Sequence, residues 1–123
     1  MTRFELHPQL ASDCETIGEL MLSRVLLMKD ANYPWVILVP KVNGIQEVHE
    51  LFECDQQQLM REVSHVGQSM KNTFQADKMN VGALGNMVPQ LHIHIIARYE
   101  NDAAWPKPVW GAVPFLSYEQ DAL

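Results

Sequence analysis

The spacing of hydrophobic positions changes along the chain, and these changes predict its secondary structure. Between Asp55 and Gln75 apolar residues recur every three or four positions, which places one apolar stripe along a long helix. The stripe consists of Leu59, Val63, Val66, Met70 and Phe74. We expect Asp55 to cap the start of this helix, with Gln58 three residues later completing a reciprocal cap.

Shorter apolar segments bounded by turn residues predict strands. Trp35 to Val39 is apolar at every position, which is typical of a strand buried on both faces, and Pro40 ends it. The remaining predicted strands are Ile17–Met21, Arg24–Lys29, Met79–Leu84 and Leu91–Arg98. The first two of these lie so close together that they form either a hairpin or a single bent strand.

The order of these elements predicts the fold class. A brief helix is expected between Leu6 and Asp13, with Pro8 near its first turn. Early strands, one long helix and two later strands are typical of an α+β domain with a largely antiparallel sheet of about five strands. The 123 residues fit one domain, 1–123, and from about residue 100 a segment rich in proline and tryptophan is expected to be an irregular strap.

Charge and composition exclude several kinds of partner. The chain has 15 Asp and Glu against 9 Lys and Arg, a formal net charge of -6, so a surface for a nucleic acid polymer or an acidic membrane would work against the overall field. A small phosphorylated molecule stays compatible, because backbone N–H groups hold a phosphate whatever the net charge. No apolar run approaches the roughly 20 residues of a membrane-spanning helix. Two distant cysteines and no secretion signal predict a cytoplasmic location.

The predicted strand after residue 90 carries the chemically informative residues. Alternation along a strand places Gln90, His92 and His94 on one face, while the apolar residues between them face the core. The two imidazoles then stand about 6.6 Å apart along the strand, from a rise of roughly 3.3 Å per residue. Such a pair is found on solvated strand faces and also among metal ligands. Gly82, Gly85 and Asn86 just before it let the backbone approach a ligand closely, which favours a phosphate site with a nucleophile beside it.

The stretch from Asn80 to Arg98 resembles the histidine triad family, whose motif is His-φ-His-φ-His-φ-φ with φ apolar. The lead-in Gly-Asn-x-Val-Pro at residues 85–89 is similar to that of the branch related to diadenosine tetraphosphate hydrolases. The resemblance extends to residues 36–41, which look like the family's strand ending in Pro-Lys, and to residues 55–75 in place of its long helix. It implies the α+β fold of that family and a homodimer.

The resemblance also implies roles for individual residues. His92 matches the middle histidine, the nucleophile that attacks the α-phosphorus of a nucleotide to form a nucleotidyl-histidine. His94 matches the third histidine, which contacts the phosphate and stabilises its charge when protonated. Asn86 matches a position that contacts phosphate oxygens, and Asp30 matches an acid that holds the ribose hydroxyls.

Further residues are expected at the substrate site. Gly85 and Asn80 belong to the same stretch, and Trp105, with Trp110, is placed to cover the imidazoles from the strap that follows the motif strand. His49 and His65 are expected on the surface.

Two other residues are not expected to contact the substrate. His7 is given no role, and Arg98 is expected to be structural.

Gln90 departs from the family motif, because it stands where the first histidine would be. An amide donates and accepts hydrogen bonds but does not titrate, so a proton relay through this position is lost. The Gln90 backbone carbonyl remains available to orient His92. Trp35 stands about where the family often has a histidine facing the first triad member, so two neighbouring positions have changed together.

Three functional hypotheses follow. The leading one is a nucleotide phosphohydrolase or nucleotidyl transferase that acts on a dinucleoside polyphosphate or a nucleoside phosphoramidate, with no obligatory metal or other cofactor. The second is a non-catalytic nucleotide sensor, since Gln90 removes a titratable group. The third is a metal-dependent hydrolase with His92 and His94 as ligands, which needs at least one further ligand from elsewhere in the chain.

Overall fold

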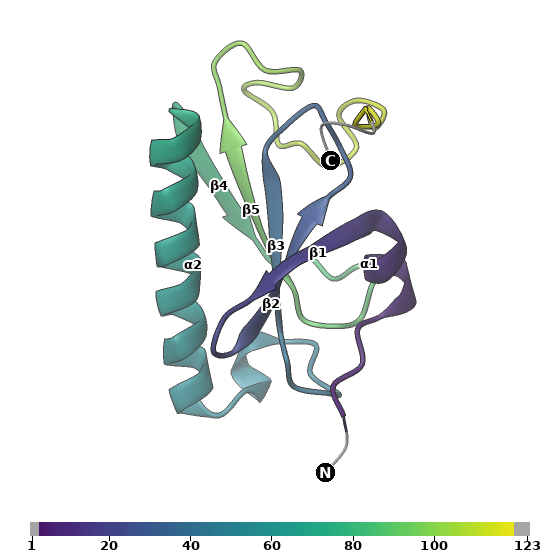
Figure 1. The fold of residues 1–123 in the computed structure, drawn as a ribbon, viewed down its shortest axis with the longest axis vertical. Coiled ribbons are helices and arrows are strands. Elements are labelled where there is room, and N and C mark those ends of the chain that lie inside the picture. Colours follow the sequence, from purple (N-terminus) through teal and green to yellow (C-terminus); the bar gives the residue numbers. More distant parts are fainter. Residues whose placement is uncertain (1–2, 120–123) are drawn as a thin grey trace.

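The structure is a computed structural model that describes residues 3–119. Its centre is one antiparallel sheet with the strand order β1-β2-β3-β5-β4 (Figure 1). The elements in chain order are α1 (Pro8–Asp13), β1 (Cys14–Glu19), β2 (Ser23–Met28), β3 (Trp35–Pro40), the 3-10 turn η1 (Val48–Glu50), α2 (Glu53–Phe74), β4 (Lys78–Gly82) and β5 (Ile93–Arg98). The predicted α+β class, with five strands, one long helix and one short helix, is confirmed.

Strands β1 and β2 form a hairpin, which decides between the two arrangements that the sequence left open. Strand β1 begins at Cys14, three residues before the predicted start, and the register shifts between Thr16 and Gly18. As an edge strand it is exposed at every position after Cys14. Without a buried face, its sequence shows no alternation that would mark its ends.

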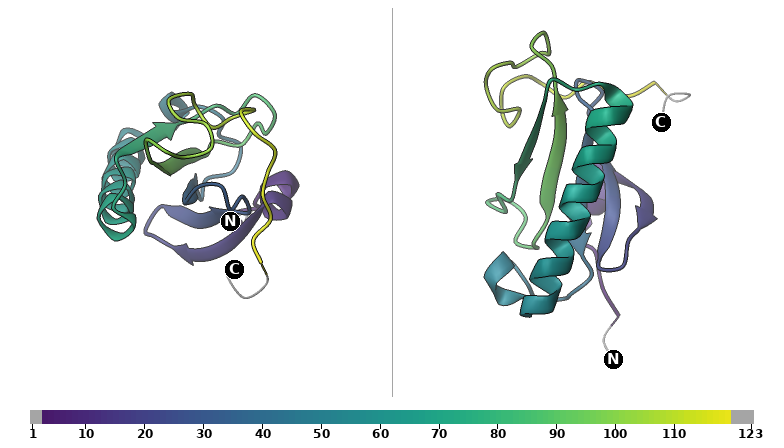
Figure 2. Two further views of the ribbon diagram at one scale, coloured as in Figure 1. Left: turned by 90° about the horizontal axis from the view of Figure 1, so that it is seen from above. Right: turned by 90° about the vertical axis from the view of Figure 1, so that its left-hand side faces the viewer.

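Both faces of the sheet are covered, and β3 shows this most clearly because all six of its residues are buried. Ile37 and Val39 belong to an apolar cluster with α1 and the C-terminal segment, whereas Leu38 belongs to a cluster beneath α2. Figure 2 shows α2 along one side of the sheet and α1 with the C-terminal segment on the other. The face opposite α2 is the one that holds the functional site described below.

The long helix begins two residues earlier than the sequence predicts. Phe52 is its N-cap residue and makes no side-chain capping bond, so the capping role expected for Asp55 is wrong. Asp55 instead lies in the first turn, where a carboxylate is favoured by the helix dipole. At the other end Gln75 takes a left-handed conformation that stops the helix. No helix within residues 3–119 is both long and apolar enough to cross a membrane.

A buried carboxylate joins α2 to the β1–β2 hairpin. Glu62 accepts the backbone N–H groups of Leu22 and Ser23 at 2.8 and 3.0 Å, and the side chain of Gln58 donates to it at 3.0 Å. Leu59, Val63 and Met70, from the predicted apolar stripe, are buried, but Phe74 at the end of the helix is exposed. The helix is therefore held by one polar anchor as well as by its apolar stripe.

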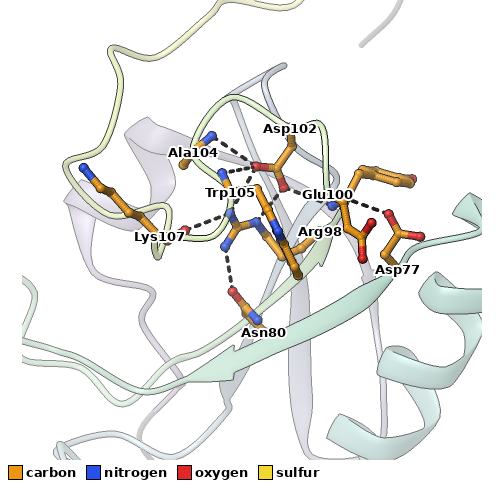
Figure 3. Close-up of polar contacts among 9 residues, drawn as sticks. Asp77, Asn80, Arg98, Glu100, Asp102, Ala104, Trp105 and Lys107 are labelled. Carbon is orange, nitrogen blue, oxygen red and sulfur yellow. Dashed lines mark hydrogen bonds and ion pairs between the residues drawn. The ribbon is translucent and has the colours of Figure 1, made fainter.

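The C-terminal segment is fixed to the sheet by Arg98, as Figure 3 shows. The guanidinium is 1% exposed and binds both oxygens of Asp102, at 2.7 and 3.1 Å. It also donates to the side chain of Asn80 at 2.7 Å and to the carbonyl of Lys107 at 2.8 Å. Arg98 thus has the structural position expected of it, because it ties the strap after residue 100 to the end of β5.

Burial alone would raise the pKa of the Asp102 carboxyl. The hydrogen bonds from Arg98 and from the backbone N–H groups of Tyr99, Ala104 and Trp105 outweigh this effect and hold the pKa well below its ordinary value. Asp102 is consequently charged at every physiological pH. The strap is anchored by its ion pair with Arg98, and both carboxylate oxygens also accept backbone hydrogen bonds.

Candidate active site

A cavity of about 480 Å³ opens on the face of the sheet opposite α2. This volume lies within the range of small-molecule sites. The cavity is enclosed by the start of the chain, the loop before β5, β5 itself and the C-terminal strap. The polar and aromatic side chains around it, with one glycine, are His7, Gln9, Asp13, Gly85, Asn86, His92, His94 and Trp110. Both motif histidines therefore face one hollow, as the strand alternation predicted.

His92 lies directly before β5, and its tautomer follows from one contact. The Nδ1 atom is 2.6 Å from the backbone carbonyl oxygen of Gln90. A carbonyl only accepts hydrogen bonds, so Nδ1 carries the proton and Nε2 keeps its lone pair. Burial lowers the pKa of His92, His7 adds to this shift and the Gln90 carbonyl opposes it. The ring is therefore neutral at physiological pH and presents a nucleophilic Nε2.

His94, in β5, has the opposite tautomer. The indole N–H of Trp35 donates to His94 Nδ1 at 3.1 Å, so the proton of the neutral ring is on Nε2. Burial, with a smaller contribution from His92, lowers the pKa of His94 to about 4. The expectation that His94 acts when protonated is therefore corrected, since at neutral pH it offers a neutral Nε2–H donor. The two imidazole rings lie 4.9 Å apart, centroid to centroid.

Gln90 uses its backbone and its side chain for different tasks. Its carbonyl orients His92, which is the arrangement that the sequence predicted. Its side-chain amide accepts the N–H of His7 at 2.8 Å and donates to the carbonyl of Glu5 at 2.9 Å. Trp35 was expected to face the first triad position, which is residue 90. It contacts His94 instead.

The aromatic residue at the cavity is Trp110 rather than Trp105. The Trp110 ring lies 5.2 Å from the His94 ring, edge to face. Trp105 instead lies 5.6 Å from the guanidinium carbon of Arg98 and does not line the cavity. Gly82 makes room for this arrangement, because a Cβ atom there would come within 3.3 Å of the Trp110 ring. The prediction that Trp105 covers the imidazoles is therefore wrong.

The structure does not bring Asn80 and Asp30 to the cavity. The Asn80 side chain binds Arg98, and because Asn80 pairs with Ile96 whereas Gly82 pairs with His94, it lies further along the sheet from the imidazoles. Asp30 is buried and accepts hydrogen bonds from Asn32 and from the backbone N–H of Leu116, at 3.2 Å for the latter. Both side chains hold the chain's own loops, so their predicted contacts with substrate are corrected.

Gly85 and Asn86 do line the cavity beside the two imidazoles. Gly85 has a φ of 71°, a left-handed conformation that glycine adopts without strain. It turns the loop between β4 and β5 toward the site. Both residues thus lie at the cavity, and their contacts with a phosphate stay a prediction.

His7 is the cavity residue that sequence reasoning missed. Its Nδ1 accepts the backbone N–H of Gln9 at 3.0 Å, so it caps the short helix α1. The His7-Pro8 pair is a signal for a helix start. No local signal places it beside His92, because that placement depends on a contact between residues 7 and 90.

The donor set does not form a metal site in the part of the chain that the structure describes. Over residues 3–119, no three His, Cys, Asp or Glu side chains lie close enough to share an ion. The metal-dependent hypothesis lacks its third ligand there. Asp13 is the sole formally charged side chain among the described residues that line the cavity, so any phosphate would meet neutral donors.

Fold and site together define an α+β protein with two neutral imidazoles beside one cavity on the central sheet, one of which has an unprotonated Nε2. Comparison with known proteins identifies the family to which the chain belongs. The HIT domain model matches residues 9–101, so the chain belongs to the histidine triad family.

Solved structures of histidine triad proteins agree. The protein from Bradyrhizobium japonicum is 49% identical, with a TM-score of 0.96, covering 98% of this chain and 90% of that one. The protein from Marinobacter aquaeolei is 52% identical, with a TM-score of 0.95 and coverage of 98% and 88%. The protein from Sinorhizobium meliloti is 44% identical, with a TM-score of 0.95 and coverage of 97% and 88%. No curated protein matches the chain.

Proposed function

We propose that this protein is a nucleotide hydrolase or nucleotidyl transferase that acts at the α-phosphate through His92. Membership of the histidine triad family supports the general class, because its members are in general nucleotide hydrolases or transferases. The observation that carries the proposal is the 2.6 Å contact between His92 Nδ1 and the Gln90 carbonyl. It leaves Nε2 unprotonated and directs the reactive lone pair away from the backbone.

In the proposed reaction His92 Nε2 attacks the α-phosphorus, and a P–N bond forms. The bond from phosphorus to the leaving group breaks, and the leaving group departs with the electron pair. The histidine ring is then cationic, and the Gln90 carbonyl stabilises it through Nδ1–H. In a second step water or another acceptor attacks the same phosphorus and loses its proton to solvent, while the P–N bond breaks and its electron pair returns to Nε2. Through both steps His94 donates its Nε2–H to a phosphate oxygen.

A dinucleoside polyphosphate suits the site as substrate. Because Gln90 does not titrate, it supplies no proton to a leaving group. A nucleoside polyphosphate leaves as a stable anion, since the last proton of a phosphate has a pKa of about 6. The amine of a nucleoside phosphoramidate needs a proton as it departs, which makes this second substrate class less favoured by the residues present. The resemblance of residues 85–89 to the branch related to diadenosine tetraphosphate hydrolases favours the same choice.

Trapping the covalent intermediate tests the proposal. Purified protein is mixed with diadenosine tetraphosphate, quenched after milliseconds to seconds, and its intact mass is measured. We expect a fraction of the wild type to carry one adenylyl group, and His92→Ala to carry none. His49→Ala is the matched control, since His49 is exposed and lies in η1. An unmodified wild type that also fails to hydrolyse the substrate would contradict the proposal.

A non-catalytic nucleotide sensor is the alternative, favoured by the loss of a titratable group at Gln90. Calorimetry with adenosine monophosphate separates it from the enzyme. Micromolar binding together with no adduct and no hydrolysis would support the sensor, whereas an adduct that turns over supports the enzyme.

We also propose that the protein forms a homodimer in a reducing compartment. β4 is an edge strand of the sheet, and apolar side chains beside it stay exposed, with Val81 at 53% and Met60 on α2 at 63%. Such a face is typical of an interface between subunits. Sedimentation velocity should show a dimer that Val81→Asp converts to a monomer. Ile17→Asp, at an exposed apolar position on the opposite edge strand β1, should stay dimeric.

A further inference from the structure

The Gln90 side chain fastens the start of the chain to the site. Its Oε1 accepts the N–H of His7 and its Nε2 donates to the carbonyl of Glu5, so two backbone groups of one segment are bound by one amide. An amide presents its acceptor and its donor side by side, whereas the two nitrogens of an imidazole point away from each other across the ring. A histidine at position 90 would not make this pair of contacts.

His7 is thereby held at the cavity that contains His92 and His94. Its Nδ1 is already used, because it accepts the backbone N–H of Gln9 at 3.0 Å. In the neutral ring the proton is consequently on Nε2, on the far side of the ring from that contact. Within residues 3–119 no hydrogen bond uses Nε2 of His7 or of His94, so each ring presents an Nε2–H donor.

The other polar side chains near His7 are engaged differently. The Gln9 amide donates to both carboxylate oxygens of Asp13, each at 3.0 Å. Asp13 brings a negative charge, which opposes phosphate binding. On this side of the cavity, the imidazole of His7 is the side chain with a donor to offer.

We propose that His7 is a phosphate-binding residue whose Nε2–H donates to a phosphate oxygen of the bound nucleotide. It thus restores an imidazole to a site whose motif has lost one at residue 90, and Gln90 is the positioning residue that holds it there. The inference rests on the proposed function, because it assumes a nucleotide in this cavity. His7 acts as a donor and transfers no proton, since its Nδ1 lone pair stays committed to Gln9.

Replacing His7 by asparagine gives a direct test. Asparagine caps a helix as well as any residue, so His7→Asn keeps the start of α1 and removes the Nε2 donor. We expect adenosine monophosphate, measured by calorimetry, to bind about 10- to 100-fold more weakly, as for the loss of one hydrogen bond to a charged group. The melting temperature should stay that of the wild type, and His49→Asn should bind normally. If His7→Asn is unstable, His7→Ser supplies the same cap with the same expected loss of affinity.

A double-mutant cycle tests the role of Gln90. Gln90→Ala removes the amide but leaves the backbone carbonyl that orients His92, so it should weaken binding to a similar degree. Because Gln90 acts through His7, the double variant should bind no more weakly than His7→Asn alone.

Three outcomes would overturn all or part of the inference, each in a distinguishable way. Wild-type affinity in both His7→Asn and His7→Ser overturns the role of His7 alone. Absence of nucleotide binding by the wild type overturns the proposed function, and this inference with it. Additive losses in the double variant overturn the positioning role of Gln90 and leave His7 as an independent contact.

Discussion

Replacing Asp102 by asparagine should detach the strap that carries Trp110 to the cavity. The carboxylate is the sole acidic partner of Arg98 among the described residues, and the guanidinium is 1% exposed. Asp102→Asn keeps the shape of the side chain but leaves a buried cation without an anion. Removing one partner of a buried ion pair costs about 3–5 kcal/mol, a large share of the 5–15 kcal/mol typical of a whole domain.

Urea unfolding measures this cost directly. With a slope of about 1.5 kcal/mol per molar urea, a loss of 3–5 kcal/mol moves the unfolding midpoint down by about 2–3 M. The matched control is Asp77→Asn, because Asp77 is an exposed acid that accepts the backbone N–H of Glu100 at 2.9 Å, a bond that asparagine also accepts (Figure 3). The control should stay within about 0.5 kcal/mol of the wild type.

The pH dependence of the same variant gives an independent check. The pKa of Asp102 is lower in the folded protein than in the unfolded chain, so its stabilisation is complete above the unfolded value near 3.8 and is lost as the pH falls further toward the folded value. Wild-type stability should therefore fall more steeply below pH 4 than that of Asp102→Asn. The reasoning would be refuted by a variant that unfolds within 1 kcal/mol of the wild type at neutral pH.

Three further predictions concern the cavity. Gly82→Ala should lower nucleotide affinity several-fold while changing the unfolding free energy by less than about 1 kcal/mol, since the new Cβ meets the Trp110 ring at 3.3 Å; calorimetry and indole fluorescence report the two effects. Trp35→Phe should let His94 leave its single tautomer, which histidine-selective ¹⁵N NMR would detect as a mixed signal in place of one Nε2–H form. For the pH profile of kcat/KM, the lowered pKa of His92 predicts activity that stays at its plateau at neutral pH and falls only below about 6.5, as the nucleophile becomes protonated. An acid limb centred above pH 7 would contradict this prediction.

Most of the fold was predicted from the sequence because the buried elements carry either a periodic or a continuous apolar pattern. All six residues of β3 are buried, and its apolar run marked it to within one residue. The start of α2 was missed because its N-cap residue, Phe52, carries no capping side chain that a sequence would reveal. The start of the edge strand β1 was predicted three residues too late for a similar reason, since exposure removes the alternation on which the prediction depends.

The site was predicted only as far as local geometry reaches. Alternation placed His92 and His94 on one face because both lie within a few residues on one stretch of chain. The tautomer of His94 could not be predicted, since it depends on Trp35, 59 residues away in sequence. The choice between Trp105 and Trp110 depended on how the strap folds around Arg98, which is a matter of tertiary packing.

The charge of the site explains why these proton positions matter. Asp13 is the one formally charged side chain among the described residues lining the cavity, and the chain as a whole carries -6, so long-range attraction does not draw a phosphate in. Affinity must then come from short-range donors, and a neutral imidazole donates from one nitrogen only. If Trp35 did not hold the proton of His94 on Nε2, the same ring would present a lone pair to the phosphate and repel it. A site built from neutral histidines therefore depends on the buried contacts that fix each tautomer as much as on the histidines themselves.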